Sequence, residues 1–196
     1  TFTVDEDLST STLVMERVGG EADANSPHTI HLSGIALQAG THSVAVPGLV
    51  DGSVYTLHIS GEDLAGNESQ TITHTGILHD EHPPTTPSSF VANGINEYQI
   101  KLSWDKSTDN PGTGIADYVI ERSSPHASSS PNLAQETYSP FKTITDTTED
   151  TYTLYDGDES HRLEEGKWYY YRIKVEDNIG NSTPWVYSQT KTNYPP

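Results

Sequence analysis

The side chains best suited to chemistry in this sequence are carboxylates, which gather in short polar segments. The chain holds 28 Asp and Glu residues against 10 Lys and Arg. Calcium takes six to eight oxygen ligands, so several acidic loops would have to converge to hold an ion. No Asp-x-Asp-x-Asp-Gly loop is present that would supply most of the ligands alone. The acids either bind calcium jointly or serve as solvated turn residues, and no other cofactor is expected.

Residues for nucleophilic catalysis are missing from the sequence. There is no cysteine, no Gly-x-Ser-x-Gly motif and no glycine-rich loop that would cradle a phosphate. Composition does not decide whether two carboxylates pair for sugar hydrolysis. The small domains inferred below seldom enclose a cleft, so we predict that the chain is not an enzyme.

Four aromatic residues form a candidate binding strip. Tyr169 and Tyr171 fit the apolar face of a strand, which places Trp168 and Tyr170 on its outward face. Trp185 and Tyr187 share one face of the next strand. Exposed aromatic rings stack on sugars or pack against partner proteins. The alternative is that these rings pair across strands beneath long Lys and Arg side chains.

The elements that position these residues are revealed by an internal repeat. Segment 49–67 (LVDGSVYTLHISGEDLAGN) and segment 163–181 (LEEGKWYYYRIKVEDNIGN) share Leu, Gly, Tyr, Ile, Glu, Asp, Gly and Asn at an offset of 114 residues. Apolar residues alternate through each segment, which predicts a half-buried antiparallel strand. Asp-x-x-Gly-Asn then predicts a turn, and the following strands are expected within 69–75 and 183–192.

Charge and composition narrow the class of protein. The net charge of −18 repels phosphate backbones and anionic membranes, so neither nucleic-acid binding nor membrane insertion is expected. Eleven Tyr, twelve Pro and fifteen Gly favour strands and turns over helices. An extracellular chain without cysteine is more typical of bacteria than of animals.

Several motifs resemble fibronectin type III domains. In both copies a Leu lies six residues before a Tyr that opens a Tyr-x-apolar-x-Ile strand, which resembles the tyrosine corner of that family. The resemblance implies that the corner residues are structural, with each tyrosine hydroxyl bonded to nearby backbone and each leucine packed on the ring. These residues are Leu49, Tyr55, Leu163 and Tyr169.

The second copy resembles the family over nearly its whole length, and LSWDKSTDNPGTGIADYVIERS is similar to bacterial fibronectin III modules. Such modules accompany secreted polysaccharide-degrading enzymes and surface proteins. The resemblance implies strands at 88–92, 98–104, 118–122, 141–144 and 151–154. The segment 123–140 is long for its position and is expected to be a surface excursion.

The first copy resembles bacterial immunoglobulin-like repeats. The segments that carry this resemblance are TVDEDLSTSTLVMERVGGEADANSPHTIHLSG and LVDGSVYTLHISGEDLAGN. Aligned with the second copy, it has a strand at 13–17 and another ending at 2–4, and it lacks its N-terminal strand. Such an open edge leaves backbone unpaired, so an upstream neighbour is expected.

The resulting prediction is an all-β chain of two tandem fibronectin-III/Ig-like antiparallel β-sandwiches. The first is expected at 1–80 and the second at 87–193, with a proline-rich linker at 81–86. Tyr194-Pro195-Pro196 resembles the linker His82-Pro83-Pro84, which suggests a further module downstream. In a tandem of this type the linker meets loops of the second sandwich. The resemblance therefore implies an interdomain calcium site from Asp51, Asp80, Glu81, Asp109 and Asp177.

We expect non-catalytic extracellular modules that act as spacer, stalk or adhesive repeats of a larger, bacterial, surface or secreted protein. Their partners would be neighbouring modules of the same chain, with a glycan or a surface protein as a further partner. The alternative function is an accessory glycan- or protein-binding module of a secreted carbohydrate-active enzyme. Retention on insoluble polysaccharide through the aromatic strip would favour this alternative.

Overall fold

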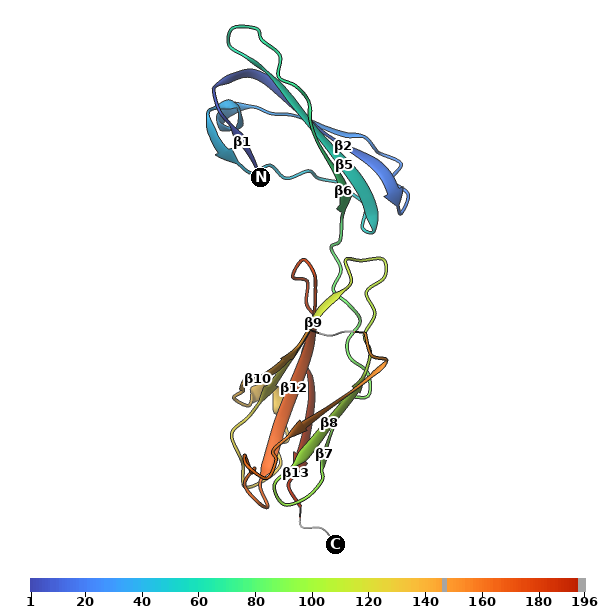
Figure 1. Ribbon diagram of the computed structural model, residues 1–196, viewed down its shortest axis with the longest axis vertical. Helices are drawn as coiled ribbons and strands as arrows, with labels where there is room; N and C mark the ends of the chain where they lie inside the picture. The colour runs from blue at the N-terminus through green and yellow to red at the C-terminus, as the bar shows by residue number, and fades with distance from the viewer. Residues whose placement is uncertain (146–147, 194–196) are drawn as a thin grey trace. The chain divides into compact units, whose positions relative to one another are not determined.

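The computed structural model describes residues 1–145 and 148–193. The repeated Tyr-Pro-Pro segment at 194–196 lies outside the described residues. The chain divides into two compact units, one spanning Thr1–Glu81 and the other beginning at His82 (Figure 1). This division falls between Glu81 and His82, within the segment 81–86 where a linker was expected. No helix among the described residues is long and apolar enough to cross a membrane.

The first unit contains six strands in two antiparallel sheets. The larger sheet has the order β3-β2-β5-β6, and the smaller sheet pairs β1 with β4. A short 3₁₀ turn, Gly34–Leu37, precedes β4. The strands are β1 (Phe2–Val4), β2 (Leu8–Gly20), β3 (His28–His31), β4 (Gly40–His42), β5 (Ser53–Asp63) and β6 (Ile72–Leu78).

Apolar alternation along β2 and β5 builds a small core in the first unit. Leu13 and Met15 of β2 lie opposite Ile59 and Leu57 of β5 in the strand register. These residues and the ring of Tyr55 face the same side of the sheet because strand side chains alternate. Leu13, Met15 and Tyr55 are the buried residues of this core cluster. The core depends on the strand that carries the sequence repeat.

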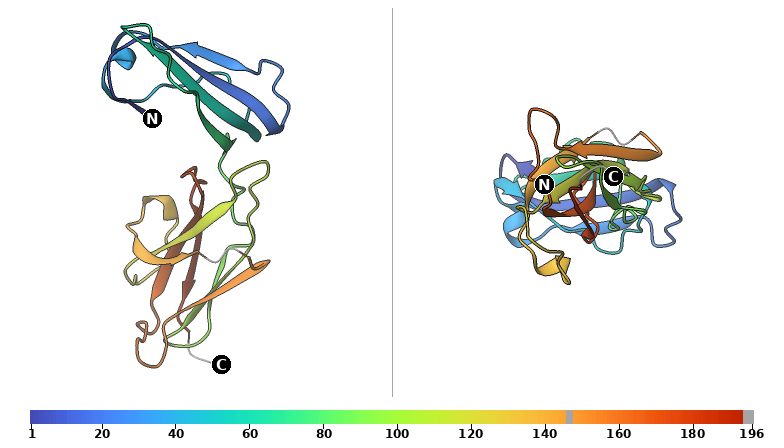
Figure 2. Two further views of the ribbon diagram at one scale, coloured as in Figure 1. Left: turned by 45° about the horizontal axis from the view of Figure 1, so that its top comes forward. Right: turned by 90° about the horizontal axis from the view of Figure 1, so that it is seen from below.

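Among its described residues, 82–145 and 148–193, the second unit contains seven strands, again in two antiparallel sheets. One sheet has the order β10-β9-β12-β13 and the other β11-β8-β7 (Figure 2). The strands are β7 (Val91–Gly94), β8 (Ile100–Asp105), β9 (Ile115–Arg122), β10 (Ser139–Ile144), β11 (Thr151–Asp156), β12 (Trp168–Asp177) and β13 (Val186–Lys191).

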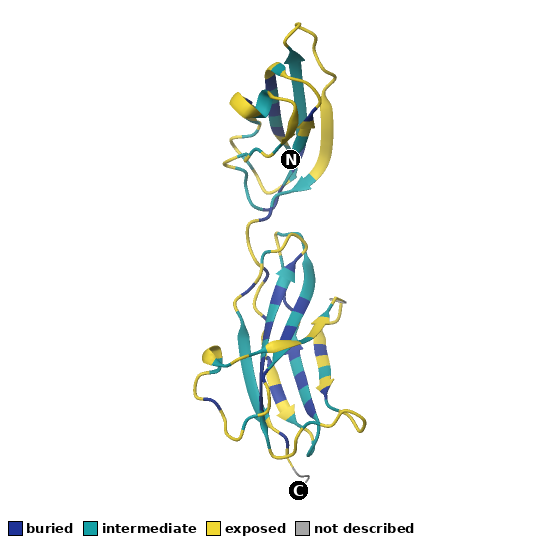
Figure 3. Cartoon of the chain, turned by 90° about the vertical axis from the view of Figure 1, so that its left-hand side faces the viewer, coloured by how far each residue is buried: buried dark blue, intermediate teal, exposed yellow. Residues whose placement is uncertain are grey.

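An aromatic cluster fills the interior of the second unit. The ring of Trp104 stacks on Tyr152 with centroids 5.3 Å apart, and Tyr152 contacts Tyr118 at 4.8 Å. Along β12, Ile173 and Val175 are fully buried, and the alternation of buried and less buried residues is visible in Figure 3. Rings of this size bury much apolar surface, which compensates for the few aliphatic residues.

The fold is the expected pair of antiparallel sandwiches, but several strand ends differ from the expectation. The strand expected at 13–17 is β2, Leu8–Gly20, because it pairs with β5 along nearly all of its length. The strand expected at 88–92 begins only at Val91. Pairing partners, which local alternation does not reveal, set these ends.

Candidate functional site

The two tyrosine corners have the same geometry. The hydroxyl of Tyr55 accepts a hydrogen bond from the backbone N–H of Val50 at 2.9 Å. The hydroxyl of Tyr169 accepts one from the backbone N–H of Glu164 at 2.8 Å. Leu49 and Leu163 pack against the cores of their respective units. Both rings are buried, so these residues hold loops in place and are not presented to a ligand.

Asp63 and Asp177 anchor the turns that follow the repeated strands. The Oδ1 atom of Asp177 accepts hydrogen bonds from the backbone N–H groups of Ile179, Gly180 and Asn181. Asp63 makes the corresponding contacts to the turn that ends at Asn67, whose side chain, together with backbone donors, lowers the pKa of Asp63. Each carboxylate is thus engaged in closing its own turn.

Arginine and aromatic rings interlock on the outer face of the β10-β9-β12-β13 sheet. The guanidinium of Arg172 lies 4.2 Å from the ring centroid of Trp185 and 4.6 Å from that of Tyr138. Its Nε also donates to Glu121 at 2.7 Å. The ring of Tyr187 contacts Tyr138 with centroids 6.1 Å apart. Cation–π contacts of this kind stabilise the sheet and occupy the ring faces.

Tyr170 is covered, which corrects the expectation that it lies exposed beside Trp168. Its ring is 2% exposed and stacks on His126 with centroids 4.3 Å apart. Its hydroxyl donates to the backbone carbonyl of Ser128. The cover is held by a pair of backbone hydrogen bonds between His126 and Trp168, each 2.9 Å long. The long excursion after β9 therefore folds back over β12.

The four predicted aromatic residues do not form a flat, open platform. Trp168, Trp185 and Tyr187 are half-buried, and Tyr170 is buried. The alternative that Lys and Arg side chains cover these rings fits Arg172, which lies over Trp185, whereas Tyr138 and His126 were not expected to pack against the rings. The outward position of Arg172 on β12 was a usable signal, because it alternates with Tyr171 and Ile173.

The predicted calcium ligands fall into two groups by unit. In the second unit, carboxylate oxygens of Asp109 and Asp177 lie within 4.8 Å of each other. Asp109 also accepts a hydrogen bond from the backbone N–H of Gly114. In the first unit, the Oδ1 of Asp51 accepts a hydrogen bond from the backbone N–H of Glu81 at 2.6 Å, and Asp80 is the preceding residue.

A buried carboxylate that the sequence analysis did not single out lies at the first tyrosine corner. The hydroxyl of Tyr55 donates to the Oδ2 atom of Asp23 at 2.7 Å, and the Nε2 atom of His28 lies 2.5 Å from the same oxygen. These hydrogen bonds, that of Tyr55 foremost, lower the pKa of Asp23 from its usual 3.8 to about 2. Asp23 and His28 are five residues apart, but Tyr55 lies 32 residues from Asp23, so no local pattern indicates that the three side chains meet.

The second unit buries a different polar cluster between its sheets. Asp156 accepts hydrogen bonds from Arg122 at 2.5 Å and from the hydroxyl of Tyr171 at 2.6 Å. Burial and the neighbouring carboxylate raise the pKa of the Tyr171 hydroxyl far above its usual range. Asp156 is buried, and both of its carboxylate oxygens are engaged within this network.

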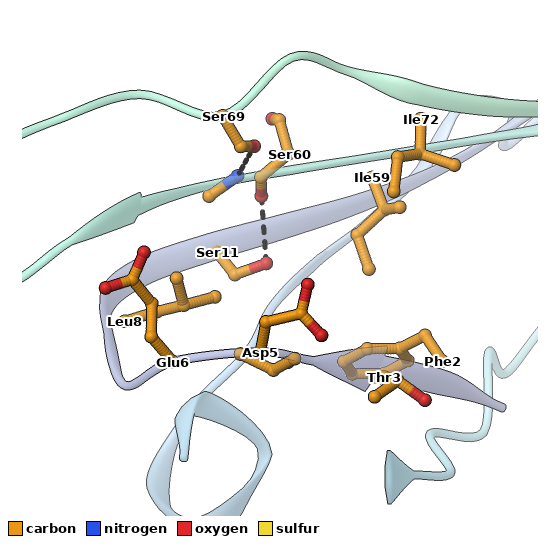
Figure 4. Close-up of a pocket in the computed structure, with 12 residues that line it drawn as sticks. Phe2, Thr3, Asp5, Glu6, Leu8, Ser11, Ile59, Ser60, Ser69 and Ile72 are labelled. Carbon is orange, nitrogen blue, oxygen red and sulfur yellow. Dashed lines mark hydrogen bonds between the residues drawn. The ribbon is translucent and has the colours of Figure 1, made fainter. Parts of the chain in front are cut away.

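A groove lies open on the first unit, between β1 and strands β5 and β6. It measures about 200 Å³, and its lining includes Phe2, Leu8, Ile59 and Ile72 (Figure 4). Asp5 and Glu6 are also part of the lining. The groove is mostly apolar, and its residues were not predicted as a site.

Comparison with known proteins shows that this chain is similar to segments of two proteins named as glucanases. A segment of 93 residues, 45% of the chain, is 32% identical to part of Endoglucanase B of Cellulomonas fimi. Over 187 residues, 88% of the chain, it is 24% identical to part of Exoglucanase B of the same species. The chain spans only 9% and 15% of the lengths of these relatives. No family model matches the chain.

A solved structure supports the fold. Domains A168-A170 from titin align with 97% of the chain and 61% of their own length, with a TM-score of 0.51 at 13% identity. Together with the paired sandwiches and their repeated corners, this likeness shows the fold. The chain is a tandem of fibronectin type III-like β-sandwiches. The first fibronectin III-like sandwich has six strands, and the part of the second that the structure describes has seven.

Proposed function

We propose that this tandem is a non-catalytic spacer within a larger, secreted, polysaccharide-degrading protein. The observation that carries the proposal is the alignment of 88% of the chain, through both sandwiches, with a segment that makes up 15% of Exoglucanase B. A segment of this kind separates or supports other parts of a long polypeptide. Its partners are then neighbouring modules, and its setting is extracellular.

The chemistry of the described residues supports a spacer over a catalyst. The carboxylates of Asp63 and Asp177 close turns, and that of Asp156 is enclosed by Arg122 and Tyr171. Glycoside hydrolysis requires two carboxyl groups across an open cleft. The net charge of −18 favours solubility and mutual repulsion of copies, as suits an exposed connector.

Glycan binding through the aromatic residues is the second candidate function. It is supported by the similarity of the chain to segments of proteins named as glucanases. Sugar stacking needs an accessible ring face. Arg172 lies over Trp185, and His126 covers Tyr170. The spacer function therefore accounts better for this face.

Retention on insoluble cellulose separates the two functions. The tandem is expected to remain in the supernatant after incubation with microcrystalline cellulose or insoluble xylan, and to release no sugar from them. Retention that is lost in Trp185→Ala or Trp168→Ala, and kept in Tyr155→Ala on the other sheet, would establish the glycan-binding function instead. Release of sugar that survives repurification would contradict both.

A further inference from the structure

One aromatic ring of the second sandwich is open to solvent. Tyr155 of β11 is 54% exposed, whereas every other Phe, Trp and Tyr side chain in the part of the chain that the structure describes is buried or half-buried. Among the same described residues, no hydrogen bond, ion pair or ring contact engages the side chain of Tyr155. The rings of Trp185 and Tyr170, by contrast, have a cation or another ring over them. Tyr155 therefore offers the accessible ring face that the opposite sheet lacks.

The side chains of Tyr155, Lys101 and Asn93, which we term the outer row, lie side by side across the β11-β8-β7 sheet. Tyr155 is the register partner of Lys101 on β8, and Lys101 is the partner of Asn93 on β7. Buried Ile100 and Leu102 flank Lys101, so the outer row points away from the core. Neighbouring strands lie about 4.8 Å apart, which gives the row a length of about 10 Å.

A second row on the same face carries two hydroxyl groups and an apolar side chain. Thr153, Ser103 and Val91 are register partners and lie two residues along each strand from the outer row. None of the six side chains in the two rows is anionic, and the ammonium of Lys101 has no ion-pair partner among the described residues. This cation disfavours a cationic ligand, and the net charge of −18 repels an anionic one. The face therefore suits a neutral ligand that combines hydroxyl groups with a flat apolar surface.

We propose that this face binds one chain of a neutral β-1,4-linked glycan, with a sugar ring stacked on Tyr155. A pyranose with equatorial hydroxyls carries axial C–H groups on its flat faces, which pack against an aromatic ring. Its hydroxyls lie around the rim, where Lys101, Asn93 and the hydroxyls of the second row can bond them. A β-1,4-linked chain is extended and follows a flat sheet, whereas an α-1,4-linked chain curls away from it.

The choice of a glycan rests on the proposed function, which places the tandem in a polysaccharide-degrading protein. A single stacked ring gives weak binding, with a dissociation constant on the order of 1–10 mM. Binding of this strength leaves the isolated tandem in the supernatant above insoluble cellulose. A spacer that other modules hold at the polysaccharide meets sugar at an effective concentration that is itself millimolar. There the face is occupied, and the spacer lies along the polymer.

Titration of the ¹⁵N-labelled full chain with soluble oligosaccharides tests the proposal. With cellopentaose, the backbone amide signals of 91–93, 101–103 and 153–155 are expected to shift and to saturate with a dissociation constant of about 1–10 mM. The amide signals of β12 and β13 should stay in place, because their rings are covered. Maltopentaose, the α-linked control, should shift the same signals at least about fivefold less.

Substitutions at Tyr155 separate ring stacking from a general effect of the sugar. Tyr155→Ala should reduce the shifts at a given cellopentaose concentration at least about fivefold, because it removes the stacking surface. Tyr155→Phe keeps the ring and should retain the affinity within about twofold. Ile179→Ala shortens a side chain that is 57% exposed and lies outside this face, and it should change nothing. The thermal midpoint of each variant shows whether it is folded.

Three results would overturn the proposal and leave the spacer function in place. They are the lack of saturable shifts at about 20 mM cellopentaose, shifts that survive Tyr155→Ala, and equal shifts with maltopentaose. Shifts of the same amides that depend on protein concentration without sugar would also overturn it, since the face would then bind a second copy. Retention on insoluble cellulose that requires Trp185 and not Tyr155 would instead contradict the spacer function.

Discussion

The two tyrosine hydroxyls at the sandwich corners accept the same backbone hydrogen bond but have different electrostatic surroundings. Tyr55 also donates to Asp23, which His28 contacts from another segment. Around Tyr169 the charged neighbours include Arg122, whose guanidinium lies 5.8 Å from the ring centroid. The same structural motif is therefore stabilised by an anion in the first sandwich and has a cation beside it in the second.

The surroundings of Asp23 predict an acid-sensitive first sandwich. The pKa of Asp23 is about 2 in the folded chain against its usual 3.8. A carboxyl group whose pKa is lowered by folding stabilises the folded chain at pH values above its unfolded-state pKa. This stabilisation is lost as the pH falls toward the folded-state pKa. The contribution of Asp23 should thus be complete above about pH 4 and vanish near pH 2.

Thermal unfolding of the chain and of Asp23→Asn measures this contribution. The difference between their first transition midpoints should be constant near neutral pH and should shrink from pH 4 to pH 2. Asp5→Asn, an exposed acid in the same sandwich, serves as the control. A difference that stays constant down to pH 2 would rule out the role assigned to Asp23.

Strand β12 and the elements around it owe part of their stability to contacts outside the core. Arg172 of β12 lies against Trp185, which precedes β13, and against Tyr138, which precedes β10. Burial raises the pKa of the Tyr138 hydroxyl to about 12, so this residue stays neutral beside the guanidinium. One cation thereby links three segments of the sheet.

Arg172→Met tests this link, because methionine keeps an apolar stem and removes the charge. The variant should lower the free energy of unfolding of the second sandwich by about 1–2 kcal/mol. Denaturant unfolding followed by tryptophan fluorescence measures it. Lys191→Met, an exposed residue of β13, should change the midpoint little. Equal effects of the two substitutions would contradict the interlocking of Arg172 with the rings.

Calcium binding by the loops stays a prediction. Asp109 and Asp177 place two carboxylates within reach of one ion, and Asp51, Asp80 and Glu81 are the further ligands expected from the sequence. An ion that binds only the folded chain must raise its melting temperature. Calcium binding would be ruled out if the melting midpoint of the chain were the same in excess calcium and in chelator, and if Asp109→Asn in excess calcium left that midpoint unchanged.

The molecule as a whole consists of two units with unequal cores. The main cluster of the second unit contains twelve buried residues, whereas that of the first contains three. Since burial of apolar surface is the chief stabilising contribution to folding, the second sandwich should be the more stable one.

Two separate unfolding transitions are therefore expected for the whole chain. All three tryptophans, Trp104, Trp168 and Trp185, lie in the second unit. Tryptophan fluorescence should report only the later transition in urea, while far-ultraviolet circular dichroism should report both. Coincident single transitions by the two probes would show that the units unfold together.

Local sequence alone determined the repeated strands and the turns that follow them, and the resemblance to fibronectin type III domains predicted the paired-sandwich fold. Alternation in Tyr55–Ile59 and Tyr169–Val175, and Asp-x-x-Gly-Asn after each, act between near neighbours in the chain. The strands and turns that these patterns produce can therefore be predicted without coordinates.

Tertiary structure alone decided which side chains are covered and which surfaces stay open. His126 over Tyr170, Asp23 beneath Tyr55, and Arg172 between Trp185 and Tyr138 each join segments far apart in sequence. Whether an outward-facing ring meets solvent depends on where a distant loop folds, and alternation carries no information about that. The groove beside β1 likewise exists only because β5 and β6 fold across from a strand whose other edge has no partner among the described residues.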